Sequence, residues 1–225
     1  MVCGGWLVGC SMRRSVIVLA SLGGMLLLSG GALANPASVA RGQDYASPFM
    51  RVFGLAQPPY GFVSFCERAP RACTQGPQEE QRFFATSARL AELNAVNRAV
   101  NHEIEPVTDI DQYGVTDYWT IPTVRGDCED YVLLKRKRLM ELGWPPSALL
   151  ITVVRDERGE GHAVLTARTV QGDFILDNKT DEIKVWHRTR YDFVMRQSYL
   201  NPRLWMSLDP REPDALPSAG VRRSN

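Results

Sequence analysis

Two segments of the chain place apolar residues at the spacing of a helix. The first covers residues 79–101, and its apolar face also carries an asparagine: Phe83, Leu90, Leu93, Val96, Asn97 and Val100. The second covers residues 128–142 and has apolar residues at Tyr131, Val132, Leu139 and Leu142. Gly143 and two prolines follow it, which is a stop signal. Because residues three and four positions apart share one face of a helix, we predict a helix in each segment.

Strand patterns begin where the second helix ends. Four segments are rich in β-branched and aromatic residues, at 148–156, 162–169, 173–178 and 183–187. Glycine-containing turns follow the first two of them, "ERGEG" and "QG". This succession predicts an antiparallel meander that follows a helix. We therefore expect an α+β fold in which a helix packs on an antiparallel sheet.

The remaining segments lack such patterns. Residues 35–78 are rich in proline, glycine and serine, so we expect an extended, loop-like arm without a periodic element. Residues 79–208 form the predicted domain, and residues 209–225 have the composition of a disordered tail. A chain of 225 residues, 44% hydrophobic and 23% charged, is long enough for one domain with a core.

An export signal precedes this arm. Two arginines are followed by an apolar run at 15–28 and by the small-x-small motif "ALA" at 32–34. This order is typical of a secretory signal peptide, so we predict that residues 1–34 are removed by cleavage after Ala34. A membrane anchor is the alternative, but the run is short for a span of about 20 residues. We expect no membrane span in the mature form.

The charge balance narrows the class of partner. The formal net charge is +1, and the one conspicuous run of like charge is "KRKR" at 135–138. This balance argues against nucleic acid or a membrane surface as the main partner. The four basic residues fall toward the C-terminal half of the second predicted helix, where cations suit the helix dipole. We expect a solvated helix face there.

Three cysteines stay in the mature chain, at Cys66, Cys73 and Cys128. Export implies an oxidising compartment, in which Cys66 and Cys73, on either side of a proline-containing loop, are expected to form a local disulfide. Cys128 is then the odd cysteine. In an exported protein such a residue is either buried or catalytic.

Cys128 stands among acids in the sequence "GDCEDY". Asp127, Glu129 and Asp130 put negative charge beside the thiol, which raises its pKa and keeps the sulfur protonated. Asp127 can act as the N-cap of the helix and Asp130 as its acidic capping-box partner, which leaves Glu129 without a use. Either Cys128 is not a nucleophile, or a positive charge neutralises these carboxylates.

Other residues favour catalysis. Cys128 lies in the first turn of a predicted helix, where the macrodipole favours a thiolate. His162 opens a predicted strand and Asp177 lies near the end of the next, so the carboxylate can hold the imidazole. The sequence has two other histidines, His102 after the first helix and His187 late in the chain, which favours His162.

The turn between these two strands tests that arrangement. A two-residue turn at "QG" (171–172) would place Asp177 opposite Thr166, four residues from His162. A triad requires a bend centred near 169–170 instead. If the bend lies elsewhere, the carboxylate of Asp177 only caps a turn.

Longer stretches resemble a known family. The run "DYWTIPTVRGDCEDYVLLKRKRLMELGWPPSALLITVV", followed by "GHAVLTART" and "GDFILDNKTDEI", resembles the bacterial transglutaminase-like cysteine proteinases, which include the periplasmic LapG-type proteases. The similarity spans about residues 80–208. It implies a papain-like or transglutaminase-like fold and a catalytic triad of Cys128, His162 and Asp177. It also implies a periplasmic location, cleavage of a large surface adhesin near its N-terminus in biofilm release, calcium dependence, and restraint by an inner-membrane receptor of the LapD type.

The resemblance implies an answer to the acids around the thiol. Asp127, Glu129 and Asp130 match the acidic cluster with which the family binds calcium beside the nucleophile. Calcium prefers about 6 to 8 oxygen ligands, so these carboxylates are the predicted metal ligands, together with backbone carbonyls and water. A bound divalent ion would leave the thiol in a neutral or positive field. Helix capping by Asp127 and Asp130 stays open as the alternative.

Our interpretation is an exported cysteine endopeptidase, and two other functions stay open. A transglutaminase or acyltransferase would use the same triad but transfer the acyl group to an amine. A catalytically silent binding module is disfavoured because all three triad candidates are present. The N–H of Cys128 is the first candidate for the oxyanion donor, with Trp119 and Asn101 as further candidates. Trp119 also suits packing, and Asn101 with Asn97 on one helix face also suits binding of loop backbone.

Overall fold

The computed structural model of the chain describes residues 47–74 and 82–211. The predicted signal peptide at 1–34 and most of the predicted tail at 209–225 lie outside these ranges, so both stay predictions. Among the described residues, no helix has the length and apolar character needed to cross a bilayer.

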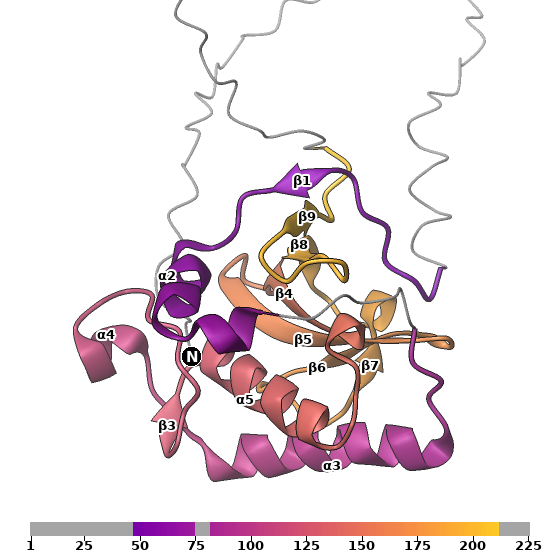
Figure 1. The fold of residues 1–225 in the computed structure, drawn as a ribbon, viewed down its shortest axis with the longest axis horizontal. Coiled ribbons are helices and arrows are strands. Elements are labelled where there is room, and N and C mark those ends of the chain that lie inside the picture. The colour runs from indigo at the N-terminus through magenta and orange to yellow at the C-terminus, as the bar shows by residue number, and fades with distance from the viewer. Residues whose placement is uncertain (1–46, 75–81, 212–225) are drawn as a thin grey trace, which may run out of the picture.

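A seven-stranded sheet forms the centre of the fold, in the order β1-β9-β8-β4-β5-β6-β7 (Figure 1). All neighbouring strands are antiparallel: β1 (Leu55–Ala56), β4 (Leu149–Arg155), β5 (Gly161–Thr169), β6 (Gly172–Leu176), β7 (Lys184–Val185), β8 (Asp192–Gln197) and β9 (Trp205–Ser207). The strands β4 to β7 pair in sequence order, which confirms the predicted meander. The sequence analysis missed β8 and β9, which extend the sheet beyond β4.

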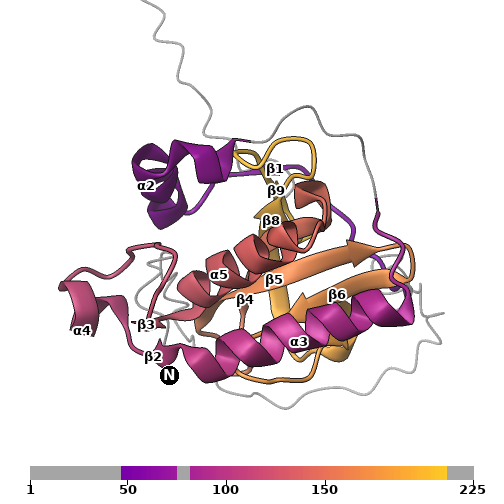
Figure 2. The ribbon, with the colours of Figure 1, turned by 60° about the horizontal axis from the view of Figure 1, so that its bottom comes forward.

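Two long helices lie side by side across one face of this sheet (Figure 2). They are α3 (Ser87–Glu103) and α5 (Cys128–Glu141), and both were predicted. Helix α3 starts later than expected because the hydroxyl of Thr86 caps it, accepting a hydrogen bond from the N–H of Arg89. Gly143 follows the end of α5 with a φ of +86°. The α+β prediction of a helix packed on an antiparallel sheet is confirmed.

Shorter elements connect these parts. They are α2 (Tyr60–Arg68), η2 (Pro70–Cys73), β2 (Glu105–Pro106), α4 (Asp109–Tyr113), β3 (Arg125–Gly126), η3 (Pro146–Ala148) and η4 (Trp186–Arg188). Two of them, α2 and η2, lie in the segment that we expected to be a loop-like arm. The expectation of an arm without a periodic element is therefore wrong for its described part.

Helix α2 contributes to the same core as α3 and α5. The ring of Phe62 packs edge-on against Trp119 and Trp205, at centroid distances of 5.6 and 5.3 Å. Phe65, one turn further on, is also buried. Burial of a side chain of this size stabilises a fold by roughly 1.5–3 kcal/mol. The boundary predicted at residue 79 therefore does not separate two cores.

The run "KRKR" is only half solvated. Lys137 and Arg138 lie at the surface, where they form ion pairs with Glu141 and Glu103. Lys135 and Arg136 are buried instead, because helix α5 is enclosed by α3 on one side and the sheet on the other. The solvated face predicted for 135–138 is therefore wrong for its first two residues.

Cys66, near the end of α2, and Cys73, at the end of η2, form a disulfide with a Cα–Cα distance of 5.5 Å. This confirms the predicted pairing. Both cysteines are buried in the core that contains Phe62. The disulfide therefore links α2 to η2 within the core.

Removal of this disulfide should destabilise the protein. The double variant Cys66→Ser, Cys73→Ser should lose roughly 2–3 kcal/mol of unfolding free energy, because the unfolded chain gains the entropy of the opened loop. Urea unfolding of the mature protein with and without a reductant measures the effect. The double variant should not respond to the reductant and is the control. Equal stability of the wild type in both conditions would contradict a stabilising role.

Candidate active site

Cys128 starts helix α5, and a short parallel strand pair leads the chain to it. Strand β3 pairs with β2, which follows directly after α3. A Cβ atom on Gly126 would lie 2.5 Å from Oδ2 and 2.7 Å from Cβ of Asp130, so only glycine leaves room for the first helical turn. The thiol thereby lies at the end of the helix where unpaired N–H groups and the macrodipole favour a thiolate.

The sulfur of Cys128 contacts the first residues of β5. The backbone N–H of Ala163 donates to Sγ of Cys128, with a nitrogen–sulfur distance of 3.3 Å. His162 is the residue before Ala163, and its side chain is buried. The contact of α5 with β5 therefore brings the candidate nucleophile and the candidate base to one place.

His162 and Asp177 form a buried pair. Nε2 of His162 lies 2.9 Å from Oδ1 of Asp177, and the same oxygen accepts a hydrogen bond of 3.0 Å from the N–H of Lys179. Burial by itself raises the pKa of Asp177, but the bond to His162, its charge and the Lys179 N–H lower that pKa to about 2. The carboxylate is therefore ionised at neutral pH and holds Nε2 of the imidazole.

The turn between β5 and β6 lies between the two positions considered from the sequence. Thr169 pairs with Gly172, so the turn consists of residues 170–171. On this register Asp177, just beyond the end of β6, is diagonal to His162 instead of opposite to it. Diagonal residues on neighbouring strands share a face and lie about 7–8 Å apart, a distance that a histidine can span. The bend expected near 169–170 is wrong by one position, yet the pair forms.

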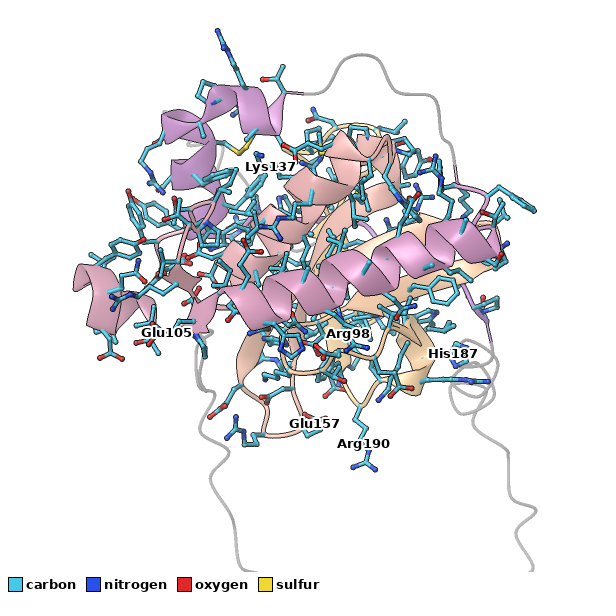
Figure 3. All side chains as sticks on the ribbon, turned by 90° about the horizontal axis from the view of Figure 1, so that it is seen from below. Arg98, Glu105, Lys137, Glu157, His187 and Arg190 are labelled. Atoms are coloured by element: carbon cyan, nitrogen blue, oxygen red, sulfur yellow. A yellow bond between two sulfur atoms is a disulfide. The ribbon has the colours of Figure 1, made fainter. Side chains whose placement is uncertain are left out.

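The other two histidines lie away from Cys128. Nε2 of His102 is 3.0 Å from Oδ2 of Asp181 on the surface. His187 lies at the edge of the molecule, on the opposite side from Glu105 of β2 in Figure 3. Because β2 and β3 lead to the start of α5, His187 is at the far end from the thiol. Of the three histidines, only His162 is next in the chain to a residue whose backbone contacts the sulfur.

The side chain of Asp127 does not cap the helix. Asp127 occupies the N-cap position without a capping hydrogen bond, and both of its carboxylate oxygens are buried without a hydrogen-bond partner among the described residues. Oδ1 of Asp130 accepts a hydrogen bond of 2.8 Å from the N–H of Thr120, whereas Oδ2 lacks a partner in the same ranges. Oε2 of Glu129 accepts a hydrogen bond from the thiol of Cys128, with a sulfur–oxygen distance of 3.2 Å. The capping alternative is therefore wrong for Asp127. Burial raises the pKa of Asp130, and a hydrogen bond from the N–H of Asp127 lowers it in part, as expected of a capping-box partner.

Two aspartates that we did not select from the sequence join this cluster. Asp109 of α4 lies with Asp117 and Glu129 in a group whose oxygens are within 4.8 Å of one another. A second such group contains Asp109, Asp127 and Asp130. The three predicted ligands thus need Asp109 to form one site. The signal for it is the acidic density of "VTDIDQYGVTDYW", which precedes the thiol in the sequence.

Helix α2 supports the outer side of the cluster. Asp117 accepts hydrogen bonds from the N–H of Gly61 at 2.8 Å and from Nε1 of Trp119 at 2.7 Å. A Cβ atom on Gly61 would lie 2.4 Å from Cδ1 of Trp119, so the close approach requires glycine. The indole of Trp119 is buried and its N–H is engaged by Asp117, which favours packing over a role as oxyanion donor.

The two asparagines of α3 bind loop backbone, as one of our interpretations held. Nδ2 of Asn97 donates to the carbonyl oxygens of Thr180 and Asp181 at 3.0 and 3.1 Å. Nδ2 of Asn101 donates to those of Asp177 and Thr180 at 3.0 and 3.1 Å. Asn101 is therefore engaged by the loop and does not act as an oxyanion donor here. The loop that both asparagines hold is the one that carries Asp177.

Burial raises the pKa of the clustered carboxyl groups. The pKa of Asp109 rises to about 7 and that of Asp130 to about 8, first because burial disfavours the charged form and then because other carboxylates are near. The pKa of Glu129 lies well above its usual value for the same two reasons. Carboxylates that repel one another fit a hard cation such as calcium, as do the buried oxygens of Asp127 and Oδ2 of Asp130, which lack hydrogen-bond partners among the described residues.

A thiol at a helix N-terminus that contacts the start of an antiparallel strand, where a histidine pairs with an aspartate, is typical of thiol proteases of the papain and transglutaminase class. The sequence matches the family of bacterial transglutaminase-like cysteine proteinases over residues 52–213, and the chain belongs to that family. The resemblance found in the sequence is thereby confirmed, and the protein is a cysteine protease. The match begins inside the predicted arm, in agreement with the core contacts of α2.

Solved structures of LapG from Legionella pneumophila are similar to this chain. An EGTA-treated form is 25% identical, covers 52% of this chain and 67% of its own, and has a TM-score of 0.44. A second form is 26% identical, covers 52% and 66%, and has a TM-score of 0.45. A calcium-bound form is 22% identical, covers 68% and 92%, and has a TM-score of 0.46. The comparison with curated proteins gives no significant match.

Proposed function

We propose that this protease is an exported endopeptidase that uses Cys128 as nucleophile, His162 as general base and acid, and Asp177 to orient the histidine. The observations that support it best are the buried bond between His162 and Asp177 and the contact of the next residue, Ala163, with the sulfur of Cys128. The strand that carries the base thus meets the nucleophile, as covalent catalysis by a thiol requires.

In the proposed mechanism each of these side chains has one role. Because Nε2 of His162 is held by Asp177, Nδ1 is the nitrogen that takes the proton of the Cys128 thiol. The thiolate attacks the peptide carbonyl, and the N–H of Cys128 is the candidate donor to the oxyanion. His162 then gives the proton to the leaving amine, which leaves a thioester on Cys128. Water, deprotonated by His162, hydrolyses the thioester and releases the free thiol.

Substitutions within this triad should separate the roles. Cys128→Ala and His162→Ala should each abolish cleavage of the substrate, and Asp177→Asn should slow it by up to about 10⁴-fold, because the histidine loses its orienting acceptor. Asp192→Asn, an exposed aspartate at the start of β8, is the matched control and should cleave at the wild-type rate. Gel electrophoresis of the products measures the rates. Turnover that survives in Cys128→Ala would end the nucleophile assignment.

Calcium is the proposed cofactor of the acidic cluster. Asp127, Glu129 and Asp130 would hold it, with Asp109 and Asp117 completing the groups of oxygens that lie within 4.8 Å. The support is that buried carboxylate oxygens of Asp127 and Asp130 lack hydrogen-bond partners among the described residues. When bound, the ion would supply positive charge that offsets the acids around the thiol. The protein residues alone carry out the proton transfers.

Removal of calcium should lower both activity and stability. A chelator leaves uncompensated negative charge near Cys128, so the pKa of its thiol should rise, and the melting temperature should fall as the start of α5 loosens. Added calcium should restore both. The variant Asp127→Asn, Glu129→Gln should be less active and indifferent to the chelator. If activity and melting temperature of the wild type do not respond to the chelator, the calcium proposal is wrong.

The proposed substrate is a large surface adhesin of the same cell, cleaved near its N-terminus to release a biofilm. The proposed regulator is an inner-membrane receptor of the LapD type that restrains the protease in the periplasm. Membership of the family supports both, and the predicted export signal supports the location.

Cleavage of that adhesin can be tested directly. The mature protein should cut the purified N-terminal region of the adhesin at one site, and the periplasmic domain of the receptor should inhibit the reaction. Mass spectrometry of the products with and without a primary amine distinguishes hydrolysis from acyl transfer. A product joined to the amine would favour the acyltransferase. An uncut adhesin would contradict the substrate while leaving the triad to its own test.

A further inference from the structure

Tyr191 contacts both members of the buried histidine–aspartate pair. Its hydroxyl donates to Oδ2 of Asp177 at 2.5 Å. Its ring also packs edge-on against the imidazole of His162, with a centroid distance of 5.7 Å and an interplanar angle of 73°. The preceding residue, Arg190, projects away from the molecule in Figure 3. Tyr191 is partly buried and contacts the candidate histidine–aspartate pair.

The strand order brings Tyr191, His162 and Asp177 to the same end of the sheet. Arg155, the last residue of β4, pairs with Gly161 on one side and with Asp192 on the other. The starts of β5 and β8 therefore flank the end of β4, and His162 and Tyr191 lie at those starts. Asp177 follows the end of β6, on the other side of β5. The bond from Tyr191 to Asp177 thus links strands that are not neighbours in the sheet, across His162.

The carboxylate of Asp177 has a complete set of partners. Oδ1 accepts hydrogen bonds from Nε2 of His162 and the N–H of Lys179. Among the described residues, Tyr191 is the only donor to Oδ2. Burial and the charge of Asp177 raise the pKa of Tyr191, which keeps its hydroxyl protonated and able to donate at neutral pH. With both oxygens engaged, the carboxylate cannot rotate away from the histidine.

We propose that Tyr191 is a positioning residue that fixes Asp177 and, through it, the ring of His162 against the thiol of Cys128. The proposal rests on the triad proposed above. It follows from the diagonal placement of Asp177, which lies past the end of β6, where the strand ladder no longer holds it. Tyr191, directly before β8, holds the second carboxylate oxygen, in addition to the bonds from Lys179 and Asn101.

The reactivity of the thiol tests this role without a substrate. Alkylation of Cys128 by iodoacetamide in the mature protein reports the thiolate fraction, which the neighbouring imidazolium increases. Tyr191→Phe keeps the ring and removes the hydroxyl. It should lower the alkylation rate at pH 6 by about tenfold, as expected for loss of one hydrogen bond to a charged group. The rates should converge above about pH 9.5, where the thiol ionises without help. Calcium in the buffer keeps the acidic cluster constant.

A double-mutant cycle distinguishes positioning from a general loss of structure. If Tyr191 acts through Asp177, Tyr191→Phe should have little further effect in the Asp177→Ala background. Tyr131→Phe is the matched control, because it removes another buried hydroxyl bond, to the carbonyl oxygen of Ile104, without contact to Asp177. Its pH profile should match that of the wild type. An equal loss from Tyr191→Phe in both backgrounds would overturn the proposal.

The same assay separates this proposal from the triad itself. His162→Ala should move the alkylation profile to the pH range of an ordinary thiol, because the imidazolium is lost. A wild-type profile in Tyr191→Phe together with a shifted profile in His162→Ala would refute the role of Tyr191 alone. A wild-type profile in His162→Ala would refute the triad, and with it the positioning role.

Discussion

The packing of α5 between α3 and the sheet is the contact on which the site depends. It carries Cys128 to the start of β5, where the N–H of Ala163 meets the sulfur. The helix is enclosed so fully that the exposed fraction of Lys135 is 0%, and burial lowers the pKa of its ammonium group to about 7. The charges of Asp177 and Asp181 counteract that shift. The buried face of α5 thus lies near the loop that presents Asp177 to His162.

The surroundings shift the pKa values of the carboxyl groups near Cys128 in opposite directions. Asp177 receives hydrogen bonds from His162, Lys179 and Tyr191, which lower its pKa to about 2. Asp130 is equally buried, but one of its oxygens lacks a donor among the described residues, and its pKa rises to about 8. Both oxygens of Asp177 thus have donors, whereas both oxygens of Asp127 and one of Asp130 lack them among the described residues, which suits a cation beside the latter two.

The N-terminal part of the described chain supports this acidic cluster from outside. The disulfide fixes α2 to η2, and the N–H of Gly61 at the start of α2 binds Asp117. Arg68, at the end of the same helix, donates to the carbonyl oxygen of Trp119 and packs over the ring of Tyr118. Through these contacts a segment with no expected structure holds the backbone that carries a candidate metal ligand.

The sequence by itself determined the elements with strong local periodicity and the residue types of the site. The helix that begins at Cys128, the meander after it and the Cys66–Cys73 pair depend on neighbours in the chain, so local patterns predict them. The short turn signal left the register between His162 and Asp177 undetermined by one position, because several turn lengths suit the same residues.

Only the tertiary structure decided which distant residues join the site. Asp109 lies in the short helix α4 and Tyr191 directly before β8, and neither belongs to the motif around Cys128. Their place follows from the parallel pairing of β2 with β3 and from the strand order β8-β4-β5-β6. Burial of Lys135 likewise results from enclosure by α3 and the sheet, which charge patterning along a single helix does not reveal. Such contacts depend on how elements pack, and the local sequence constrains that only weakly.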